Sequence, residues 1–453
     1  MTGIWMEENI KCFICTVTPF RKGLNIFIFD EYKYYFKNMR LLYNLGIWLY
    51  GLILRIISPF HPKAKLWTEG RKDILNRISQ TVEKGQKHIW FHFASLGEFE
   101  QGRAVLEQIK KRFPHEKIVI TFFSPSGYEI RKNSNLADYV FYLPEDTASN
   151  ASQFIDIINP KFVVITKYEY WYHYFKELKK REIRLLMISA IFREEQIFFK
   201  PYGGFFRSIL KNVTYFFAQN MDSVHMLKWI GLTNAGLAGD TRFDRVVELP
   251  NQHRHITQVV DFVQENKVLV AGSTWKPDEE LLQKLSIAYG DWKFIIAPHE
   301  IHKAHIEEIT KLFGEEVLLF SQFGSYSSTK IQQSKILVID NIGMLSSLYH
   351  YADIAYIGGG FGVGIHNTLE AATYGKPVIF GPKYEKFQEA IDLVTLMAGF
   401  SISNYEELKL VFDSLQDEKV IQETGDSAKK YVQQRAGATQ IIMKYLETER
   451  LLN

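Results

Sequence analysis

From residue 88 onwards, short apolar runs alternate with longer segments of helical pattern. His88–Phe93 is apolar and of strand length, and the helical pattern after it continues to Arg112. Further runs of the same kind are Lys117–Phe123, Phe162–Thr166, Leu185–Ser189 and Tyr215–Ala218. Short strands that are apolar throughout and are separated by helices are typical of a parallel sheet covered on both faces.

The alternation restarts after a polar and charged segment, residues 242–266, which we expect to be an interdomain linker. The later apolar runs are Lys267–Ala271, Lys293–Ala297, Ile336–Ile339, Ile354–Ile357 and Pro377–Phe380. A chain of 453 residues is also longer than one hydrophobic core usually supports. We therefore expect an α/β fold with two Rossmann-like domains, 61–241 and 267–453, facing each other across a cleft.

The N-terminal region does not follow this pattern. Leu41–Ile57 is almost entirely apolar, whereas residues 1–38 show no clear period before the aromatic run Tyr32–Phe36. We expect residues 39–60 to form a membrane-associated helix, with a buried core helix as the alternative. We expect 1–38 to be an extension, with Met39 as the true start. Basic residues follow the helix and would keep this side cytoplasmic, near anionic lipid, unless they are a solvated loop: Lys63, Lys65, Arg71, Lys72 and Arg77.

Composition and known motifs exclude several classes of function. The net charge of +3 does not indicate a nucleic-acid partner. The two cysteines, Cys12 and Cys15, have no second pair to complete a zinc site and are expected to be incidental. The chain has no phosphate-binding P-loop, no Asp-x-Asp for a metal-bound diphosphate and no G-x-S-x-G nucleophile motif. We expect no metal and no cofactor.

The strongest local signal is the glycine-rich segment Gly358–Gly364, which follows a predicted strand and precedes His366 and Asn367. Glycines at this place let the backbone approach a ligand closely. A helix that starts near Asn367 would direct its free N–H groups at a phosphate, and Glu370 one turn later can accept both ribose hydroxyls. The order of strand, glycines, His366-Asn367, helix and Glu370 favours nucleotide binding. A glycine-rich turn followed by a capped helix is the alternative.

A second signal is Ser95-Leu96-Gly97-Glu98, which follows the first predicted strand. Glu98 opens a helix, where the positive end of the helix dipole stabilises an ionised carboxylate. Such a carboxylate can take a proton from an acceptor hydroxyl. A glutamate that simply starts a helix is the alternative.

Together these motifs resemble the Kdo (3-deoxy-D-manno-octulosonic acid) transferases from about Met39 to the C-terminus. The matching segments are His92–Glu98, Ser124–Gly127, Glu169–Trp171, Ala218–Asn220, Gly239–Asp244, Gly272–Thr274, His366–Glu370 and Gly381–Pro382. The chain departs from the family pattern at Lys167, Trp275–Pro277, Pro298–Glu300 and Ile365. An arginine that the family has is missing from Pro298–Glu300. These departures leave the contacts to phosphate and sugar open, but they do not affect Glu98 or His366–Glu370.

The resemblance implies a glycosyltransferase-B fold and an inverting transfer of Kdo from CMP-Kdo to a lipid A precursor. It implies Glu98 as the general base, with the acceptor bound by the N-terminal domain at the cytoplasmic face of the inner membrane. The implied donor-binding residues are Arg242, Gly272, Ser273, Thr274, Gly358, Gly359, Gly360, His366, Asn367 and Glu370. Possible acceptor or cleft residues are Ser95, Gly97, Ser126, Gly127 and Glu169.

Two other functions are considered beside this one. One is a UDP-sugar-dependent glycosyltransferase or epimerase of the same fold. The nucleotide distinguishes the two, because a cytosine site must satisfy a hydrogen-bond donor on the ring edge that uracil lacks. The other is a non-catalytic nucleotide-binding protein at the membrane, which nucleotide would stabilise against heat without turnover.

Overall fold

The computed structural model describes residues 21–452 and divides the chain into two compact units. The first unit takes in the chain up to Gly102, Leu106–Ala238 and the C-terminal segment from Lys444, and the second takes in Arg103–Val105 and Gly239–Met443. The expectations about Cys12, Cys15 and the first part of the N-terminal extension fall outside the described residues.

A seven-stranded sheet forms the centre of the first unit, and all its strand pairs are parallel. Its order is β3-β2-β1-β4-β5-β6-β7, so the order reverses between β1 and β4. The strands are β1 (His88–Phe93), β2 (Lys117–Phe122), β3 (Tyr139–Tyr142), β4 (Pro160–Thr166), β5 (Arg184–Ala190), β6 (Tyr215–Ala218) and β7 (Ala235–Leu237). All six residues of β1 are buried, as expected for a strand covered on both faces.

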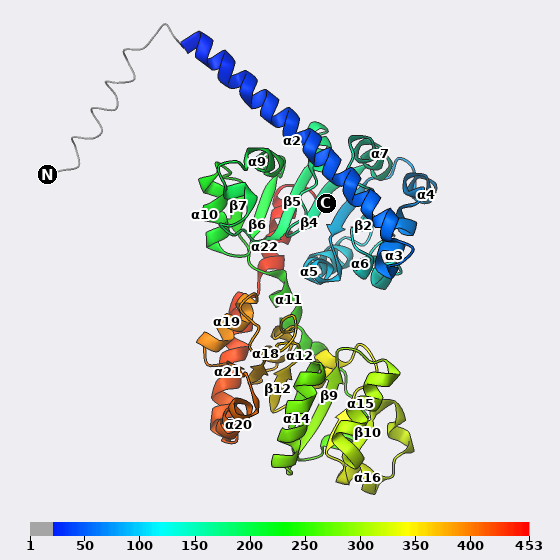
Figure 1. Ribbon diagram of the computed structural model, residues 1–453, viewed down its shortest axis with the longest axis vertical. Helices are drawn as coiled ribbons and strands as arrows, with labels where there is room; N and C mark the ends of the chain where they lie inside the picture. The colour runs from blue at the N-terminus through cyan, green and yellow to red at the C-terminus, as the bar shows by residue number, and fades with distance from the viewer. Residues whose placement is uncertain (1–20, 453) are drawn as a thin grey trace, which may run out of the picture. The chain divides into compact units, whose positions relative to one another are not determined.

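Helices cover this sheet and are visible in Figure 1. They are α3 (Pro62–Arg71), α4 (Ile74–Thr81), α5 (Leu96–Arg112), α6 (Pro125–Arg131), α7 (Ala148–Ile158), α8 (Tyr172–Lys180), η1 (Ile197–Phe199), α9 (Gly204–Leu210) and α10 (Met221–Trp229). The strand–helix alternation predicted from the sequence is thus confirmed in this half of the chain.

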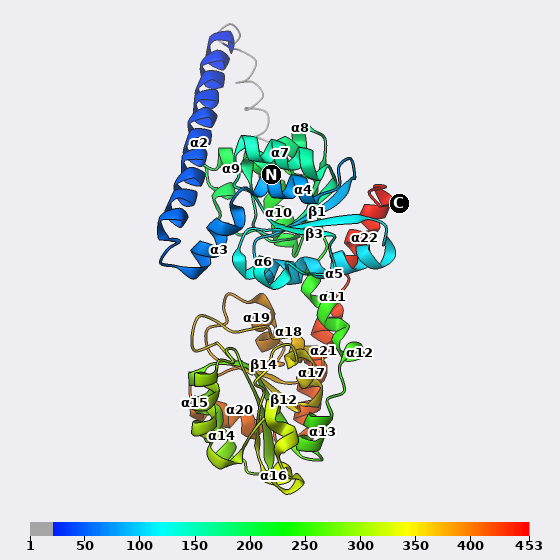
Figure 2. The ribbon, with the colours of Figure 1, turned by 90° about the vertical axis from the view of Figure 1, so that its right-hand side faces the viewer.

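The N-terminal helix α2 (Arg21–Ile57) begins before Met39 and therefore crosses the boundary expected there. It lies beside α3 and α9 (Figure 2). By length and composition, Asn38–Ile57 is the one candidate membrane span in the described part of the chain, and only 6% of its most apolar window is buried. A buried core helix, the alternative considered above, would not leave this stretch so exposed.

The second unit repeats the architecture with another seven-stranded parallel sheet, ordered β10-β11-β9-β8-β12-β13-β14. The strands are β8 (Lys267–Thr274), β9 (Trp292–Pro298), β10 (Val317–Leu319), β11 (Ile336–Val338), β12 (Ile354–Ile357), β13 (Val378–Phe380) and β14 (Gly399–Ser401). Here the order reverses between β8 and β12. Two such sheets confirm the predicted α/β class with Rossmann-like topology.

The helices of the second unit are more varied in length. They are α11 (Thr241–Val247), α12 (Leu249–Gln252), α13 (Thr257–Val263), α14 (Lys276–Ala288), α15 (Lys303–Phe313), η2 (Gly314–Glu316), η3 (Phe320–Ser325), α16 (Ser328–Gln333), α17 (Leu345–Leu348), η4 (Tyr349–Tyr351), α18 (Leu369–Ala372), α19 (Gln388–Thr395), α20 (Tyr405–Ser414), α21 (Glu418–Arg435) and α22 (Ala438–Thr448).

Two expected domain boundaries differ from the structure. Residues 242–266 are polar overall, yet they form α11, α12 and α13, and their apolar side chains, such as Phe243 and Phe262, enter the core of the second unit. The segment is therefore part of that unit rather than a free linker. The chain returns to the first unit at Lys444, where Tyr445 of α22 packs on Tyr215 with the ring centres 4.7 Å apart.

Candidate functional site

The first unit gathers its candidate residues at one edge of the sheet. β1 and β4 are the neighbours between which the strand order reverses, and in open α/β sheets ligands bind beyond the carboxyl ends of such a pair. Ser95, Gly97 and Glu98 follow the end of β1, and Glu169 follows the end of β4. The structure thus brings together residues that are far apart in the sequence.

Glu98 lies in the first turn of α5, as predicted, and is partly exposed. The Ser95 hydroxyl donates a hydrogen bond to Glu98 Oε2. Gly97 lies between them and is exposed. Because glycine has no side chain, nothing at this position covers the carboxylate. The positive end of the α5 dipole and the serine hydroxyl both stabilise negative charge on Glu98. The arrangement suits a carboxylate that receives a proton.

The turn after β2 packs directly against this loop. Ser126 and Gly127 lie at the start of α6, where the Ser126 N–H donates to Ser124 Oγ at 3.2 Å. A Cβ atom on Gly127 would lie 3.1 Å from the carbonyl carbon of Ser95 and 2.3 Å from the Phe122 ring. The glycine therefore lets α6 approach the segment that carries Glu98.

Glu169 is held by a chain of hydrogen bonds through the buried His92. Thr121 Oγ1 accepts from Trp90 Nε1 at 2.8 Å and lies 2.8 Å from His92 Nδ1. His92 Nε2 lies 3.2 Å from Glu169 Oε2 and 3.2 Å from Trp171 Nε1. The Trp171 indole N–H donates to the same carboxylate oxygen at 2.8 Å. Among the described residues, the hydrogen bonds to Glu169 all go to Oε2, which leaves Oε1 for a ligand.

In the second unit the candidate residues again lie where the strand order reverses. Gly272, Ser273 and Thr274 end β8, and Gly358 and the glycines after it follow β12. The Gly358 N–H donates to the Gly272 carbonyl at 2.9 Å. A Cβ atom on Gly358 would lie 2.3 Å from the Ser273 carbonyl oxygen, and one on Gly360 would lie 2.6 Å from Gly381 Cα. Close backbone packing therefore requires glycine at both positions.

A buried carboxylate that the sequence analysis did not single out holds the glycine loop in place. Asp278 Oδ2 accepts from the backbone N–H of Gly359 at 3.0 Å and of Trp275 at 2.9 Å, and Oδ1 accepts from Tyr356 Oη at 2.8 Å. Burial raises the pKa of the Asp278 carboxyl. It bonds the backbone N–H of the N-cap residue Trp275 at the start of α14, but Trp-x-x-Asp is not the Ser/Thr-x-x-Glu pattern of a capping box, so no sequence signal marks it.

Two predicted donor ligands are engaged with other side chains. The buried Thr274 hydroxyl donates to Glu279 Oε1 at 3.0 Å, which leaves its oxygen only as an acceptor. His366 Nε2 accepts from Trp275 Nε1 at 3.2 Å, and its ring stacks on His299 with the centres 4.4 Å apart. Burial lowers the pKa of His366 to about 4, so the imidazole is neutral at physiological pH.

Asn367 and Glu370 lie together, but the helix between them is shorter than predicted. Asn367 Nδ2 donates to Glu370 Oε1 at 3.1 Å, and Asn367 Oδ1 accepts from the Leu369 N–H at 3.1 Å. Burial raises the pKa of Glu370. The helix α18 has only four residues and begins at Leu369, and the His366 N–H before it donates to the Gly358 carbonyl. A helix of one turn has only a small macrodipole. The helix dipole expected near Asn367 is therefore wrong, and only individual backbone N–H groups remain there to meet a phosphate.

Arg242 is already surrounded by acidic groups. Its Nε donates to Asp240 Oδ2 at 2.9 Å, and Nη1 and Nη2 donate to the Glu389 carboxylate at 2.7 and 3.2 Å. Glu389 was not identified from the sequence, because it is a buried helix residue with no motif around it. A phosphate contact from Arg242 would have to use the remaining N–H of Nη1.

Comparisons with known proteins show a likeness to the Kdo transferases. Residues 70–245 match the family model described as 3-deoxy-D-manno-octulosonic-acid transferase (kdotransferase). The 3-deoxy-D-manno-octulosonic acid transferase of Aquifex aeolicus is 26% identical over 74% of this chain and 88% of its own length. That of Rickettsia bellii is 25% identical over 77% of this chain and 85% of its own length. A bifunctional glycosyltransferase/methyltransferase of Fusobacterium nucleatum is 25% identical over 82% of this chain, which spans 59% of that relative.

Solved structures agree on the fold. UDP-GlcNAc 2-epimerase from Neisseria meningitidis, bound to UDP-GlcNAc, aligns with a TM-score of 0.57 and 16% identity, over 80% of this chain and 100% of the epimerase chain. MurG from Acinetobacter baumannii aligns with a TM-score of 0.51 and 13% identity, over 80% of this chain and 99% of its own. At such low identity these likenesses show the two-domain glycosyltransferase-B architecture and no more.

Proposed function

We propose that the chain is a Kdo transferase that moves Kdo from CMP-Kdo to a lipid A precursor in lipopolysaccharide assembly, because residues 70–245 match that family's model and its relatives include Kdo transferases. The observation that carries this proposal is the position of Glu98. The carboxylate lies at the carboxyl edge of the first sheet, where its strand order reverses, and within the segment that matches the family. We assign it the role of general base.

In this mechanism the acceptor hydroxyl lies against Glu98, which takes its proton as the oxygen attacks the anomeric carbon of Kdo. CMP leaves from the opposite side, so the configuration at that carbon inverts. The Ser95 hydroxyl holds Glu98 in place before the acceptor arrives. Trp171 and His92 fix the Glu169 carboxylate through its Oε2, and its Oε1 stabilises positive charge that develops on the sugar ring.

The second unit supplies the donor site in this proposal. The packing of Gly358 and Gly360 against neighbouring backbone leaves no side chain between the loop and a bound phosphate. Asn367 and Glu370 lie within hydrogen-bond distance of one another and offer an amide and a carboxylate to the ribose. Arg242 contributes one N–H to the phosphate. The transfer is expected to need no metal, since the CMP leaving group already carries its charge on a phosphate.

The helix α2 is proposed to lie in the membrane interface rather than across the bilayer. One face is docked on the first unit, since Tyr43 donates to Asp146, Asn44 Oδ1 lies 2.7 Å from His173 Nε2, and Arg55 pairs with Glu145. These contacts are spread along the helix and would break if it crossed the bilayer. The opposite face exposes Leu41, Leu42, Leu45, Trp48, Leu49, Ile53 and Ile56. Such a broad apolar face suits insertion at the cytoplasmic surface of the inner membrane.

The proposal is tested by offering purified protein a lipid A precursor with CMP-Kdo, and separately with UDP-sugars, and following the lipid product by mass spectrometry. We expect a mass increase of one or more Kdo units with CMP-Kdo only. Transfer from a UDP-sugar would support the related UDP-dependent enzymes instead. Heat stabilisation by CMP without any product would support a non-catalytic binding protein.

A further inference from the structure

The helix α8, which follows the segment that carries Glu169, begins without a cap of its own. Its N-cap residue is Trp171, and an indole ring has no oxygen that could accept a backbone N–H. The Trp171 indole N–H instead donates to Glu169 Oε2 at 2.8 Å. The first N–H groups of a helix have no partner inside the helix, so other parts of the chain must satisfy those of α8. The groups that do so fix the start of α8 and the position of Trp171.

Two residues from outside α8 supply this cap. The buried Asp146 carboxylate accepts from the His173 N–H through Oδ2 at 3.1 Å and from the Tyr174 N–H through Oδ1 at 3.0 Å. The Tyr43 hydroxyl of α2 accepts from the Tyr172 N–H at 3.2 Å. The first three N–H groups of α8 are therefore all bonded, and one of them is bonded directly to α2.

The Tyr43 hydroxyl also supports the other half of the cap. It donates to Asp146 Oδ2, the oxygen that accepts from the His173 N–H. Asp146 is only 3% exposed, and burial raises the pKa of its carboxyl to about 6. A buried carboxylate needs hydrogen bonds to remain ionised, and Tyr43 supplies one of them. Loss of this hydroxyl therefore affects the Tyr172 N–H and the Asp146 carboxylate at once.

A second contact between α2 and Trp171 runs through Phe123. Tyr50 lies about two helical turns after Tyr43, on the same side of α2. Its ring stacks on Phe123 with the ring centres 5.9 Å apart, and Phe123 packs on the Trp171 indole at 5.0 Å. The helix α2 thus holds the backbone of Trp171 through the cap and its ring through Phe123.

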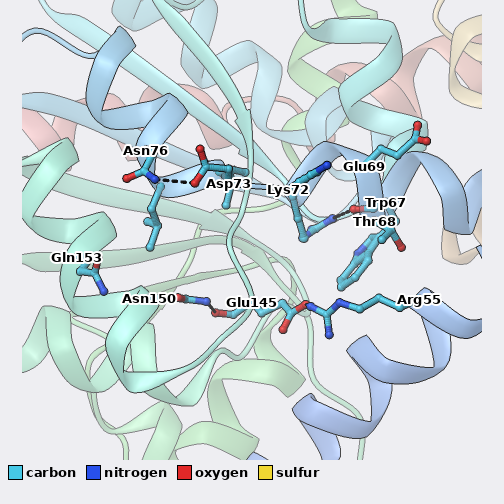
Figure 3. Close-up of a pocket in the computed structure, with 13 residues that line it drawn as sticks. Arg55, Trp67, Thr68, Glu69, Lys72, Asp73, Asn76, Glu145, Asn150 and Gln153 are labelled. Carbon is cyan, nitrogen blue, oxygen red and sulfur yellow. Dashed lines mark hydrogen bonds and ion pairs between the residues drawn. The ribbon is translucent and has the colours of Figure 1, made fainter.

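Near its end, α2 is attached to the first unit by a different contact. Arg55 forms an ion pair with Glu145, the residue before Asp146 (Figure 3). Half of the Arg55 side chain is exposed, and such pairs contribute little to stability. Among the residues that the structure describes, no hydrogen bond joins this pair to α8. The two contacts of α2 therefore differ in whether they reach the segment that carries Glu169.

We propose that Tyr43 is a positioning residue for the transfer reaction: it fixes the start of α8, and with it the Trp171 indole that holds the Glu169 carboxylate. This inference rests on the proposed function, in which Glu169 Oε1 stabilises positive charge on the sugar ring. A charged group stabilises a transition state best when it is already in place and need not reorganise. The helix α2 is then a part of the site as well as a membrane-facing element.

The test is Tyr43→Phe, which removes the hydroxyl and keeps the ring. The ring should stay in place, since it packs on Tyr172, His173 and Phe205 with centre distances of 5.7, 6.0 and 5.9 Å. We expect kcat to fall about tenfold, as for the loss of a helix cap, while the KM for CMP-Kdo stays the same. Arg55→Gln is the matched control, because it removes the other contact of α2, and it should leave kcat unchanged. A wild-type kcat in Tyr43→Phe, or equal losses in the two variants, would overturn the proposal.

A double-mutant cycle with Glu169→Gln separates positioning from a general loss of stability. Because Tyr43 is proposed to act through Glu169, Tyr43→Phe should lower kcat in the wild-type background but not in the Glu169→Gln background. The same fold loss in both backgrounds would show that Tyr43 does not act through this carboxylate.

Amide hydrogen exchange of the full chain tests the hold on α8 independently of the reaction. Tyr43→Phe should speed exchange at the start of α8, residues 172–174, and Arg55→Gln should not. If the wild type transfers no Kdo, the proposed function fails, while faster exchange in Tyr43→Phe alone would still show that Tyr43 holds this segment. Equal exchange in wild type and both variants would refute that hold whether or not transfer occurs.

Discussion

The glycine loop of the second unit allows a sharp test of the donor site through Gly358→Ala. The new Cβ would lie 2.3 Å from the Ser273 carbonyl oxygen and 2.6 Å from Thr274 Cα. Both are backbone atoms, so they cannot rotate away as a side chain would. The ends of β8 and β12 must separate instead, which strains the Gly358–Gly272 hydrogen bond of 2.9 Å.

The cost follows from the two effects of this substitution. Overpacking costs about 1–3 kcal/mol, and a lost hydrogen bond adds about 1 kcal/mol. Strain of this size falls on the segment proposed to receive the CMP phosphate. If half of this strain free energy appears as weaker CMP binding, the CMP affinity drops about tenfold, since 1.4 kcal/mol corresponds to a factor of ten.

Isothermal titration of CMP into Gly358→Ala measures this directly, with circular dichroism to confirm that the variant is folded. Gly362→Ala is the matched control in the same loop, because the nearest atom to its Cβ, the Gly359 carbonyl oxygen, is at an ordinary 3.5 Å. We expect control and wild type to bind alike. A folded Gly358→Ala protein that binds CMP as tightly as wild type would refute the assignment of this loop to the donor.

Three further predictions concern the first unit. Thr121→Val removes the hydroxyl between Trp90 and His92 and should cost about 1–3 kcal/mol in urea unfolding and lower kcat, whereas Thr121→Ser should restore both. Burial lowers the pKa of His173 from 6.5 to about 4. Between these two pH values the unfolded state is protonated at His173 and the folded state is not, so the free energy of unfolding decreases as the pH falls. Between about pH 7.5 and pH 5 this amounts to about 2 kcal/mol, and an unchanged slope in His173→Gln would contradict it. Trp48→Glu places a charge on the exposed face of α2 and should reduce vesicle flotation severalfold; undiminished flotation would exclude that face from the membrane.

The interior strands could be predicted from the sequence because each is an uninterrupted apolar run. The four strands that were not predicted are β3, β7, β10 and β14, and they are the four edges of the two sheets. β3 and β10 are apolar but have only four and three residues, and β7 and β14 have three residues each and contain a glycine, so none of the four stood out as a strand. Three of the four residues of β3 are also only partly buried. The sequence pattern therefore specified the centre of each sheet but not its limits.

The site shows a similar division. Glu98 and the glycine loop could be identified because strand ends and glycine clusters are local signals. The contacts of Asp278 with Gly359 and of Glu389 with Arg242 join residues that are distant in the chain and depend on tertiary packing. No periodicity or spacing encodes such pairs. The same holds for the hydrogen bonds that fix Glu169.

The proposed transfer reaction depends most on Glu98 as the base. The direct test is single-turnover transfer from freshly made CMP-Kdo to a tetra-acylated lipid A precursor, comparing wild type with Glu98→Ala and measuring CMP affinity of both. We expect transfer by wild type and a rate at least about a hundredfold lower in the variant, with the CMP affinity unchanged. Transfer by Glu98→Ala at the wild-type rate would contradict it.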